Sequence, residues 1–367
     1  MRVKYNYLPL EFKNTKNIFK RWKHLIKSTD FTLGRYIREF EEKFAKFAKS
    51  KYCIATNNGT DALILALKAI NVKTGDEVIT VCNSFYATTG AIVNVGAIPI
   101  YVDCDDRYQI DISQIEKKIT KKTKAILPVH WGGASPDMNA ICRIAKKYKI
   151  KVIEDACMGI GASIKGKHPG TFGEIGAFSM HPLKSLNVMG DAGAIVTNNK
   201  KIYDWLLKYR NHGMINRDEN VIWGVNCRMQ PLQAIVALEG LKKINNVIKK
   251  RAKNCKILDS ELSRMSDKII IPRRPNGYKE THALYMILCE KRDKLKKFLE
   301  KNKIEAKIHY RIPLHLQKAY LNKYKKVVMP QSEYQAKKLL TLPIHQFINQ
   351  NQIKYIAKKI ITFYKIN

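Results

Sequence analysis

The sequence predicts an α/β protein with a mainly parallel sheet in a large domain and a smaller C-terminal α+β domain. The chain has 367 residues, too many for one minimal domain. Up to about residue 240, short apolar strands alternate with helices, as in a parallel sheet covered on both faces. Beyond that point, long Lys-rich helices surround a few short strands. We therefore expect a large domain over 1–240 and a small domain over 241–367, on which the extreme N-terminus can pack.

The large domain is expected to begin with an amphipathic helix at 35–50, where apolar residues recur at helical spacing. Strands are then expected at 52–56, 77–81, 99–102, 125–129, 151–154, 177–180 and 194–197. Helices are expected between them at 61–70, 86–95, 112–119 and 137–148. Because these strands are largely apolar, we expect the sheet to be buried on both faces.

The small domain is expected to contain three long helices and three short strands. The helices are placed at 235–265, 291–302 and 351–363, and the strands at 268–271, 283–289 and 305–309. No flexible Gly/Ser-rich segment separates the two domains, so we expect them to pack tightly against each other.

The chain is strongly basic, with a net charge of +36. Such a charge alone suggests nucleic acid or an anionic membrane as a partner. The lysines, however, are spread over what look like helix surfaces, without a basic arm or a recognisable DNA-reading motif. We therefore expect no nucleic-acid partner, although the charge can help to attract an anionic substrate such as a sugar nucleotide.

The eight cysteines are scattered and contain no C-x-x-C pair, which argues against a zinc site or a disulfide framework. We expect reduced, buried thiols and no metal. The N-terminus lacks the apolar core of a signal peptide, and no apolar run approaches the ~20 residues that span a bilayer. A soluble, cytoplasmic protein without a membrane partner is therefore expected.

Four features in chain order suggest a site for a phosphorylated ligand. Gly59 and Thr60 precede a helix whose N-terminus could bind phosphate. Asp155 ends a buried strand, where open α/β sheets bind ligands. Ser179 ends another strand, and Lys184 follows in a loop where an amine can form a Schiff base. The fourth feature, residues 224–229, precedes a helix at 231–241.

Each of these features also has a purely structural interpretation. Gly59-Thr60 and Asp155 could simply begin helices as capping positions. A single lysine in a Lys-rich chain is usually a solvated surface group, and residues 224–229 could be an ordinary polar loop. The order of the four features, rather than any one of them, carries the prediction.

The order of longer motifs is more specific. The chain contains NNGTDAL, DEVIT, NSFYAT, GAIPIYVD, TKAILPVHWGG, VIEDA, FSMHPLKSLNVMGDAGAIVTNN, RNHG, GVNCRM and HYRIPLHLQKAY. In this order they resemble the DegT/DnrJ/EryC1/StrS family of sugar aminotransferases, over roughly residues 10 to 360. The resemblance implies a fold-type-I enzyme that depends on pyridoxal 5'-phosphate (PLP).

The resemblance also implies roles for individual residues. Lys184 would bind PLP as a Schiff base and then transfer protons, and Asp155 would pair with the pyridinium nitrogen. Phe85 would stack on the ring, and Met158 lies at a further cofactor-binding position. The phosphate would be held by Gly59, Thr60 and Ser179. Asn226 would reach the phosphate in the neighbouring subunit, which implies a homodimer with shared active sites. The sugar would be lined by His181, Arg228, Tyr310, His315 and His345.

Three positions depart from the family pattern. Met158 stands where relatives commonly carry a Gln or His that donates to the phenolic oxygen of the cofactor, and a thioether cannot donate. Ala192 replaces the usual second glycine of a Gly-Asp-Gly-Gly run, and His130–Gly133 differs from the more common His-Leu-Tyr-Gly. These departures suggest a distinct substrate branch.

The expected activity is transamination, with L-glutamate as the amino donor, pyridoxamine phosphate as the intermediate cofactor form and a keto-sugar as the acceptor. A nucleotide-linked 3- or 4-keto-6-deoxy sugar is the favoured substrate, and the product would serve amino-sugar and polysaccharide biosynthesis. An acidic, non-nucleotide sugar aldehyde is an alternative. A PLP-dependent sugar dehydratase is another, but such relatives replace the lysine with histidine. A regulator that binds nucleic acid is the non-enzymatic alternative.

Overall fold

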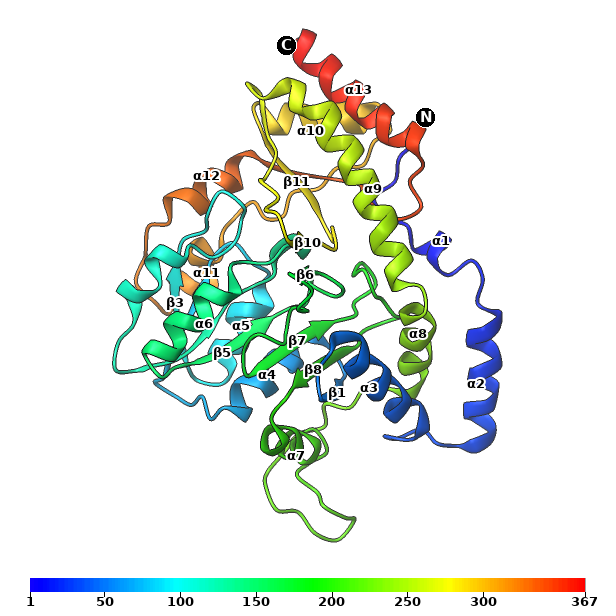
Figure 1. Ribbon diagram of the computed structural model, residues 1–367, viewed down its shortest axis with the longest axis vertical. Helices are drawn as coiled ribbons and strands as arrows, with labels where there is room; N and C mark the ends of the chain where they lie inside the picture. Colours follow the sequence, from blue (N-terminus) through cyan, green and yellow to red (C-terminus); the bar gives the residue numbers. More distant parts are fainter. Residues whose placement is uncertain (367) are drawn as a thin grey trace.

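The computed structural model, which describes residues 1–366, is built on a seven-stranded sheet (Figure 1). The strands are β1 (Tyr52–Thr56), β2 (Glu77–Val81), β3 (Ile98–Val102), β4 (Thr123–Leu127), β5 (Lys151–Asp155), β7 (Ile175–Ser179) and β8 (Gly193–Thr197). Their order across the sheet is β1-β8-β7-β5-β4-β2-β3. Only β8 runs antiparallel to its neighbours β1 and β7, so the prediction of a mainly parallel sheet is confirmed.

Helices cover both faces of this sheet. They include α3 (Arg35–Ala48), α4 (Gly59–Ala69), α5 (Tyr86–Asn94), α6 (Met138–Lys147), α7 (Lys200–Tyr209) and α8 (Pro231–Leu241). Alternate residues of β1 show how the faces are divided: Cys53 and Ala55 pack with α3 and α8, whereas Ile54 packs with α4 and α7. Because successive side chains of a strand point to opposite faces, a strand buried on both sides is apolar throughout.

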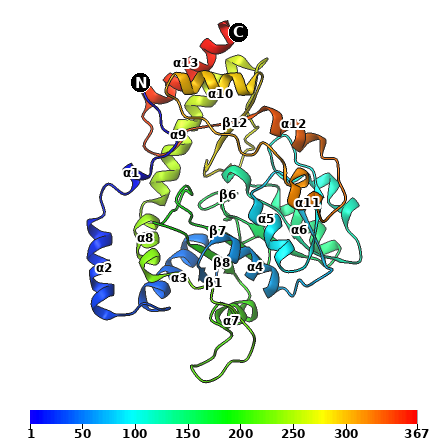
Figure 2. The same cartoon turned by 180° about the vertical axis from the view of Figure 1, so that it is seen from behind.

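The C-terminal part surrounds a second, three-stranded antiparallel sheet. It consists of β9 (Ile269–Ile270), β11 (Tyr285–Cys289) and β12 (Leu339–Leu342), in the order β12-β11-β9. The helices packed here are α9 (Ile244–Leu262), α10 (Arg292–Lys301) and α13 (Gln350–Ile366). Val3 is fully buried in the same core and pairs with Ile304, so the N-terminus lies against the C-terminal part (Figure 2).

The remaining elements connect or flank these two parts. They are the helices α1 (Leu8–Glu11), α2 (Lys16–Ser28), α11 (Lys318–Leu321) and α12 (Pro330–Lys338), and the two-stranded ribbon of β6 (Ser163–Ile164) and β10 (Tyr278–Lys279). The ribbon pairs a segment of the first 240 residues with one of the C-terminal part. Within residues 1–366, no helix combines the length and apolar character needed to cross a bilayer.

Three elements differ from their predictions. Residues 112–119 form two 3-10 turns instead of one helix, Ile112–Gln114 and Glu116–Lys118. The helix expected at 235–265 is interrupted at Lys242-Lys243, between the end of α8 and the start of α9. The strand expected at 305–309 is wrong, because Lys307 makes only an isolated bridge to Thr341. The strand that pairs with β11 is instead β12. It follows α12 directly, and the sequence pattern did not predict it.

A buried ion pair fixes the strand that leads to the predicted phosphate seat. Glu41 on α3 accepts a hydrogen bond from the amide of Ala55 at 2.8 Å. Arg210 donates through Nη1 to the carbonyl of Ala55 at 2.7 Å and also pairs with Glu41. Both side chains are buried, at 9% and 4% exposure. Residues from α3 and the end of α7 thus hold the same peptide of β1.

We predict that Glu41→Ala lowers the free energy of unfolding by about 3–5 kcal/mol, because it leaves the Arg210 charge buried and unpaired. Urea unfolding followed by circular dichroism measures the change. Glu42→Ala, at the exposed next position, is the control and should leave stability within about 0.5 kcal/mol. Equal effects of the two substitutions would contradict the assignment.

Candidate active site

A cavity of about 340 Å³ lies at the edge of the large sheet where the parallel strands end. The segments that follow β1, β2, β4, β5 and β7 all contribute to it. The opposite wall comes from the N-terminal segment, from α9 and from residues near β11 and β12. Carboxyl ends of parallel strands meet at one edge of a sheet, so residues far apart in sequence are brought together here.

The N-terminus of α4, which the sequence predicts as a phosphate seat, lies at one end of the cavity. Asn58 caps the helix by accepting from the amide of Asp61 at 2.8 Å. Within residues 1–366, the amides of Gly59 and Thr60 have no hydrogen-bond partner, and Ser179 lies beside them. A Cβ on Gly59 would lie 2.6 Å from the Cβ of Ser179, so only glycine permits this close approach. Free amides, the helix dipole and a hydroxyl together suit a phosphate group.

Asp155, at the end of β5, is buried and held by a chain of hydroxyl groups. Thr88 on α5 donates to Asp155 Oδ2 at 2.8 Å, and its own hydroxyl oxygen is 2.7 Å from that of Ser84. The amide of Cys157 donates to Oδ1 at 3.2 Å. These hydrogen bonds fix the orientation of the carboxyl group.

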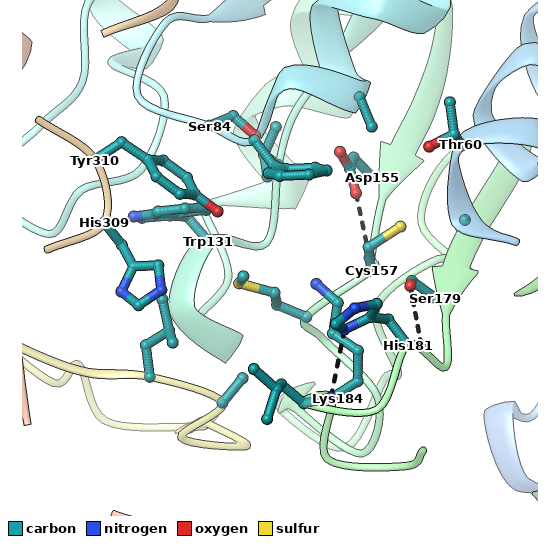
Figure 3. A pocket seen from close by; sticks show the side chains of 18 of the residues that line it. Thr60, Ser84, Trp131, Asp155, Cys157, Ser179, His181, Lys184, His309 and Tyr310 are labelled. Carbon is teal, nitrogen blue, oxygen red and sulfur yellow. Dashed lines mark hydrogen bonds between the residues drawn. The ribbon is translucent and has the colours of Figure 1, made fainter. Parts of the chain in front are cut away.

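Lys184 lies across the cavity from Asp155, in the loop after β7 (Figure 3). Its Nζ has no hydrogen-bond or ion-pair partner in the part of the chain that the structure describes. Its carbonyl accepts from Tyr7 Oη at 3.1 Å and from Asn187 Nδ2 at 3.3 Å. The backbone of the lysine is therefore held firmly while its amine stays available for chemistry.

Aromatic side chains line the other end of the cavity. Tyr310 lies 6.1 Å from Phe85, 5.9 Å from Tyr86 and 5.6 Å from Trp131, measured between ring centroids. Figure 3 shows Tyr310, Trp131 and His309 on the side away from Thr60 and Ser179. The cavity thus has a phosphate end and an aromatic end, with Lys184 between them.

The histidines of the cavity favour their neutral forms. Burial lowers the pKa of His309 to about 4, with a further contribution from the charge of Lys184. Burial likewise lowers the pKa of His345 to about 4. The pKa of His181 is lowered by partial burial, an effect that Lys184 strengthens and Asp191 opposes. Near neutral pH these rings can therefore accept a hydrogen bond from a ligand through an unprotonated nitrogen.

Most of the residues expected from the sequence line this single cavity. They are Gly59, Thr60, Phe85, Asp155, Met158, Ser179, His181, Lys184, Tyr310 and His345. Three expected residues do not. His315 is fully buried elsewhere, 3.0 Å from Glu333, so its expected contact with the sugar is not supported. Arg228 instead donates to Asn211 at 2.8 Å, and Asn226 is exposed outside the cavity of its own chain.

Sequence reasoning missed several residues of the cavity, and it also missed Thr88, which contacts Asp155 without lining the cavity. Thr88 and Trp131 lie in quoted motifs, but nothing local showed that Thr88 would reach Asp155. His309 begins the quoted motif HYRIPLHLQKAY and is adjacent to the expected Tyr310, but neither fact assigned it a role. Tyr5, Tyr7 and Arg251 also line the cavity. They lie on the N-terminal segment and on α9, which no spacing rule connects with Lys184.

Comparison with known proteins identifies the family. The model of the DegT/DnrJ/EryC1/StrS aminotransferase family matches residues 13–361. The chain belongs to this family. It is therefore a PLP-dependent aminotransferase of the expected fold. The family match also explains why the motifs of the large domain and those near residues 309–320 occur in one order along the chain.

Individual relatives extend over nearly the whole chain. A pleiotropic regulatory protein of Geobacillus stearothermophilus is 35% identical, with 93% of this chain and 92% of that protein covered. The dTDP-3-amino-3,6-dideoxy-α-D-galactopyranose transaminase of Aneurinibacillus thermoaerophilus is 34% identical, with 94% of each covered. Among solved structures, NtdA of Bacillus subtilis with bound pyridoxamine phosphate (PMP) is 30% identical, with a TM-score of 0.94 and coverage of 99% and 85%.

The residues of the cavity fit PLP. The free amides beside Ser179 suit its phosphate, and the Gly59 contact explains why a side chain is excluded there. Asp155 is an oriented carboxylate that would hold the pyridine nitrogen, and Lys184, whose amine has no partner among the described residues, would bind the aldehyde. Met158 lines the cavity, so its departure from the usual Gln or His changes the site itself.

We predict that Thr88→Val weakens PLP binding by about tenfold or more, because a hydrogen bond to a buried charged group is lost. The dissociation constant can be measured by titrating the apoprotein with PLP and following its absorbance. Thr89→Val is the matched control, since Thr89 instead lies 2.7 Å from the hydroxyl of Tyr101. Unchanged affinity in Thr88→Val would show that Asp155 does not need this contact.

Proposed function

We propose that this enzyme transfers the amino group of L-glutamate to a keto-sugar, with a nucleotide-linked 3- or 4-keto-6-deoxy sugar as the favoured substrate. The observation that carries the proposal is the unpartnered amine of Lys184, placed between an oriented Asp155 and the aromatic end of the cavity. Aromatic rings bind the apolar faces of sugars, and the neutral histidines can accept hydrogen bonds from hydroxyl groups. The product would serve amino-sugar and surface-polysaccharide synthesis.

Different side chains have different roles in transamination. Bound PLP supplies an electron sink that stabilises negative charge at the reacting carbon. Lys184 Nζ takes the proton from the Cα of the amino donor and, in the second half-reaction, returns a proton to the sugar carbon. Asp155 keeps the pyridine nitrogen protonated, and Thr88 keeps Asp155 in place. The walls from the N-terminal segment and the C-terminal part limit the access of water to these atoms.

Two alternative functions are less well supported. An acidic, non-nucleotide sugar aldehyde would also fit a cavity with an aromatic end. A PLP-dependent sugar dehydratase would require that the lysine be lost, and Lys184 is present. We further place the enzyme in the cytoplasm, because its eight cysteines are all free thiols, as in a reducing compartment.

We predict that Lys184→Ala abolishes transamination, with a loss of at least about a hundredfold, because the amine proposed as the base for the proton transfer is removed. The test is the conversion of bound PLP to PMP by L-glutamate, followed by absorbance. Lys201→Ala, an exposed position on α7, should retain the wild-type rate. Conversion at an unchanged rate in Lys184→Ala would overturn the assignment.

We also propose that the enzyme acts as a homodimer in which Asn226 completes the site of its neighbour. The loop that follows α7 projects from the molecule (Figure 1). This loop exposes large apolar side chains, including Trp223 at 91%, Ile215 at 51% and Val221 at 46%. Exposed apolar clusters of this kind indicate a protein interface. Asn226, exposed on the same segment, would then face a second copy of the chain.

Hybrid dimers test this arrangement. Lys184→Ala and Asn226→Ala chains should each be impaired alone, but mixing and refolding them together should restore activity, because one site of a hybrid then has both side chains intact. Trp223→Asp should convert the dimer into monomers in light-scattering measurements. If mixing restores nothing while both variants dimerise, Asn226 does not serve the neighbouring site.

A further inference from the structure

Arg251 on α9 is a buried cation that lines the active cavity without a carboxylate partner. It is 1% exposed, and none of the described acidic side chains lies within ion-pair distance of it. A charge taken out of water is normally paired, because the cost of removing its hydration is large. The buried charge of Arg251 must therefore be stabilised either by neutral hydrogen-bond partners or by an anionic ligand.

The other buried arginines differ from Arg251. Arg210 pairs with Glu41, and Arg292 pairs with Asp293 at 3.0 Å. Arg107 has no ion pair either, but it donates to the carbonyls of Ser135 and Arg273 and does not line the active cavity. Arg251 is the one buried arginine of residues 1–366 that faces the reacting groups.

Neutral groups satisfy most of the guanidinium of Arg251. Nε donates to Gln346 Oε1 at 3.0 Å, and Nη1 lies 3.3 Å from both Ser185 Oγ and the carbonyl of His282. Nη2 donates to Tyr7 Oη at 3.0 Å. A guanidinium has five N–H donors. One N–H of Nη2 therefore has no acceptor among the described residues. Glu11 makes no ion pair with Arg251, although it accepts from Gln346 and its charge interacts with that of Arg251.

Hydrogen bonds connect Arg251 to Lys184 and not to the residues of the phosphate seat. Tyr7 Oη joins Arg251 Nη2 to the carbonyl of Lys184, over 3.0 and 3.1 Å. None of the hydrogen-bond partners of Arg251 belongs to the seat at Gly59, Thr60 and Ser179. An anion bound by Arg251 would thus lie in the same cavity as Lys184 but separate from the predicted phosphate seat.

His345 provides a second unpartnered polar group in the same wall. The ring is 7% exposed and lines the cavity. Its Nε2 lies 3.0 Å from the carbonyl of Lys4, whereas its buried Nδ1 has no hydrogen-bond partner within residues 1–366. Since Nε2 faces a carbonyl and must donate, Nδ1 is an acceptor. A cation and an acceptor side by side suit a ligand that carries both a carboxylate and an N–H or O–H group.

We propose that Arg251 binds a carboxylate group of a substrate. This inference rests on the proposed transamination, in which two substrates can carry that group. The first is the amino donor, because L-glutamate has two carboxylates. The second is an acidic sugar, whose carboxylate would replace a neutral hydroxymethyl or methyl group. Both sources share the same chemistry at Arg251.

A direct binding measurement tests the site without turnover. Glutarate, an unreactive dicarboxylate of the length of glutamate, is titrated into the holoenzyme in a calorimeter. We expect Arg251→Gln to weaken its binding by about 10- to 100-fold, the effect of losing a hydrogen bond to a charged group. Glutaramide, its neutral analogue, should bind wild type and Arg251→Gln equally. Arg251→Lys, which retains the charge, should bind glutarate more tightly than Arg251→Gln and covers the case in which the glutamine variant does not fold.

Two half-reactions distinguish the sources. Glutamate converts bound PLP to PMP in the first half-reaction. A dTDP-linked 3-amino sugar also converts bound PLP to PMP, because it runs the second half-reaction in reverse. If Arg251 binds the donor, Arg251→Gln slows only the glutamate reaction. If it binds an acidic sugar, Arg251→Gln slows only the reaction of a nucleotide-linked 3-amino uronate.

Tyr7→Phe is the matched control for a purely structural role. It removes the hydroxyl that joins Arg251 to the Lys184 carbonyl but keeps the cation, so we expect it to slow both half-reactions alike. The inference is overturned if Arg251→Gln slows the reactions of glutamate and of the neutral amino sugar equally, or if it changes neither the binding of glutarate nor the reaction of any substrate that carries a carboxylate. Weaker glutarate binding in an enzyme that converts none of the substrates would overturn the proposed function and retain the carboxylate site.

Discussion

The convergence of parallel strands at one sheet edge is the constraint on which the rest of the structure depends. The ends of β1, β5 and β7 deliver the phosphate seat, Asp155 and the loop of Lys184 to a single cavity. β8 runs antiparallel between β1 and β7, which allows β1 to remain parallel to the other strands while it borders this edge. Each strand must be apolar on both faces, since α3 and α8 cover one side and α4, α5 and α7 the other. The polar groups that perform chemistry are therefore confined to the strand ends.

Buried hydrogen bonds then orient these groups. Asp155 is fixed by Thr88 and Ser84, and the carbonyl of Lys184 is fixed by Tyr7 and Asn187. The amine of the lysine has no partner among residues 1–366, so the site combines a rigid frame with an available amine. A site preorganised in this way needs little rearrangement when charge develops during the reaction.

The cavity is closed by segments that are distant in sequence from the sheet. Val3 lies in the C-terminal core, and Tyr7 then continues to the loop of Lys184. Arg251 on α9 and Gln346 after β12 meet at the same point. The N-terminal segment thus connects the C-terminal part to the reacting lysine. The strong positive charge of the chain provides a general attraction for anionic substrates, whereas the buried Arg251 could recognise one specific group.

The sequence by itself determined the fold class, because apolar strands that alternate with helices are a local pattern, and it determined the family, because the ordered motifs resemble those of known sugar aminotransferases. It also led to Tyr310 and His345 as cavity residues. It could not place His315, which packs against Glu333, since a histidine in a family motif looks the same whether it is buried or lines a site. The roles of Thr88, Tyr7 and Arg251 were decided only by tertiary structure, because hydrogen bonds that span up to 244 residues leave no periodic trace in the chain.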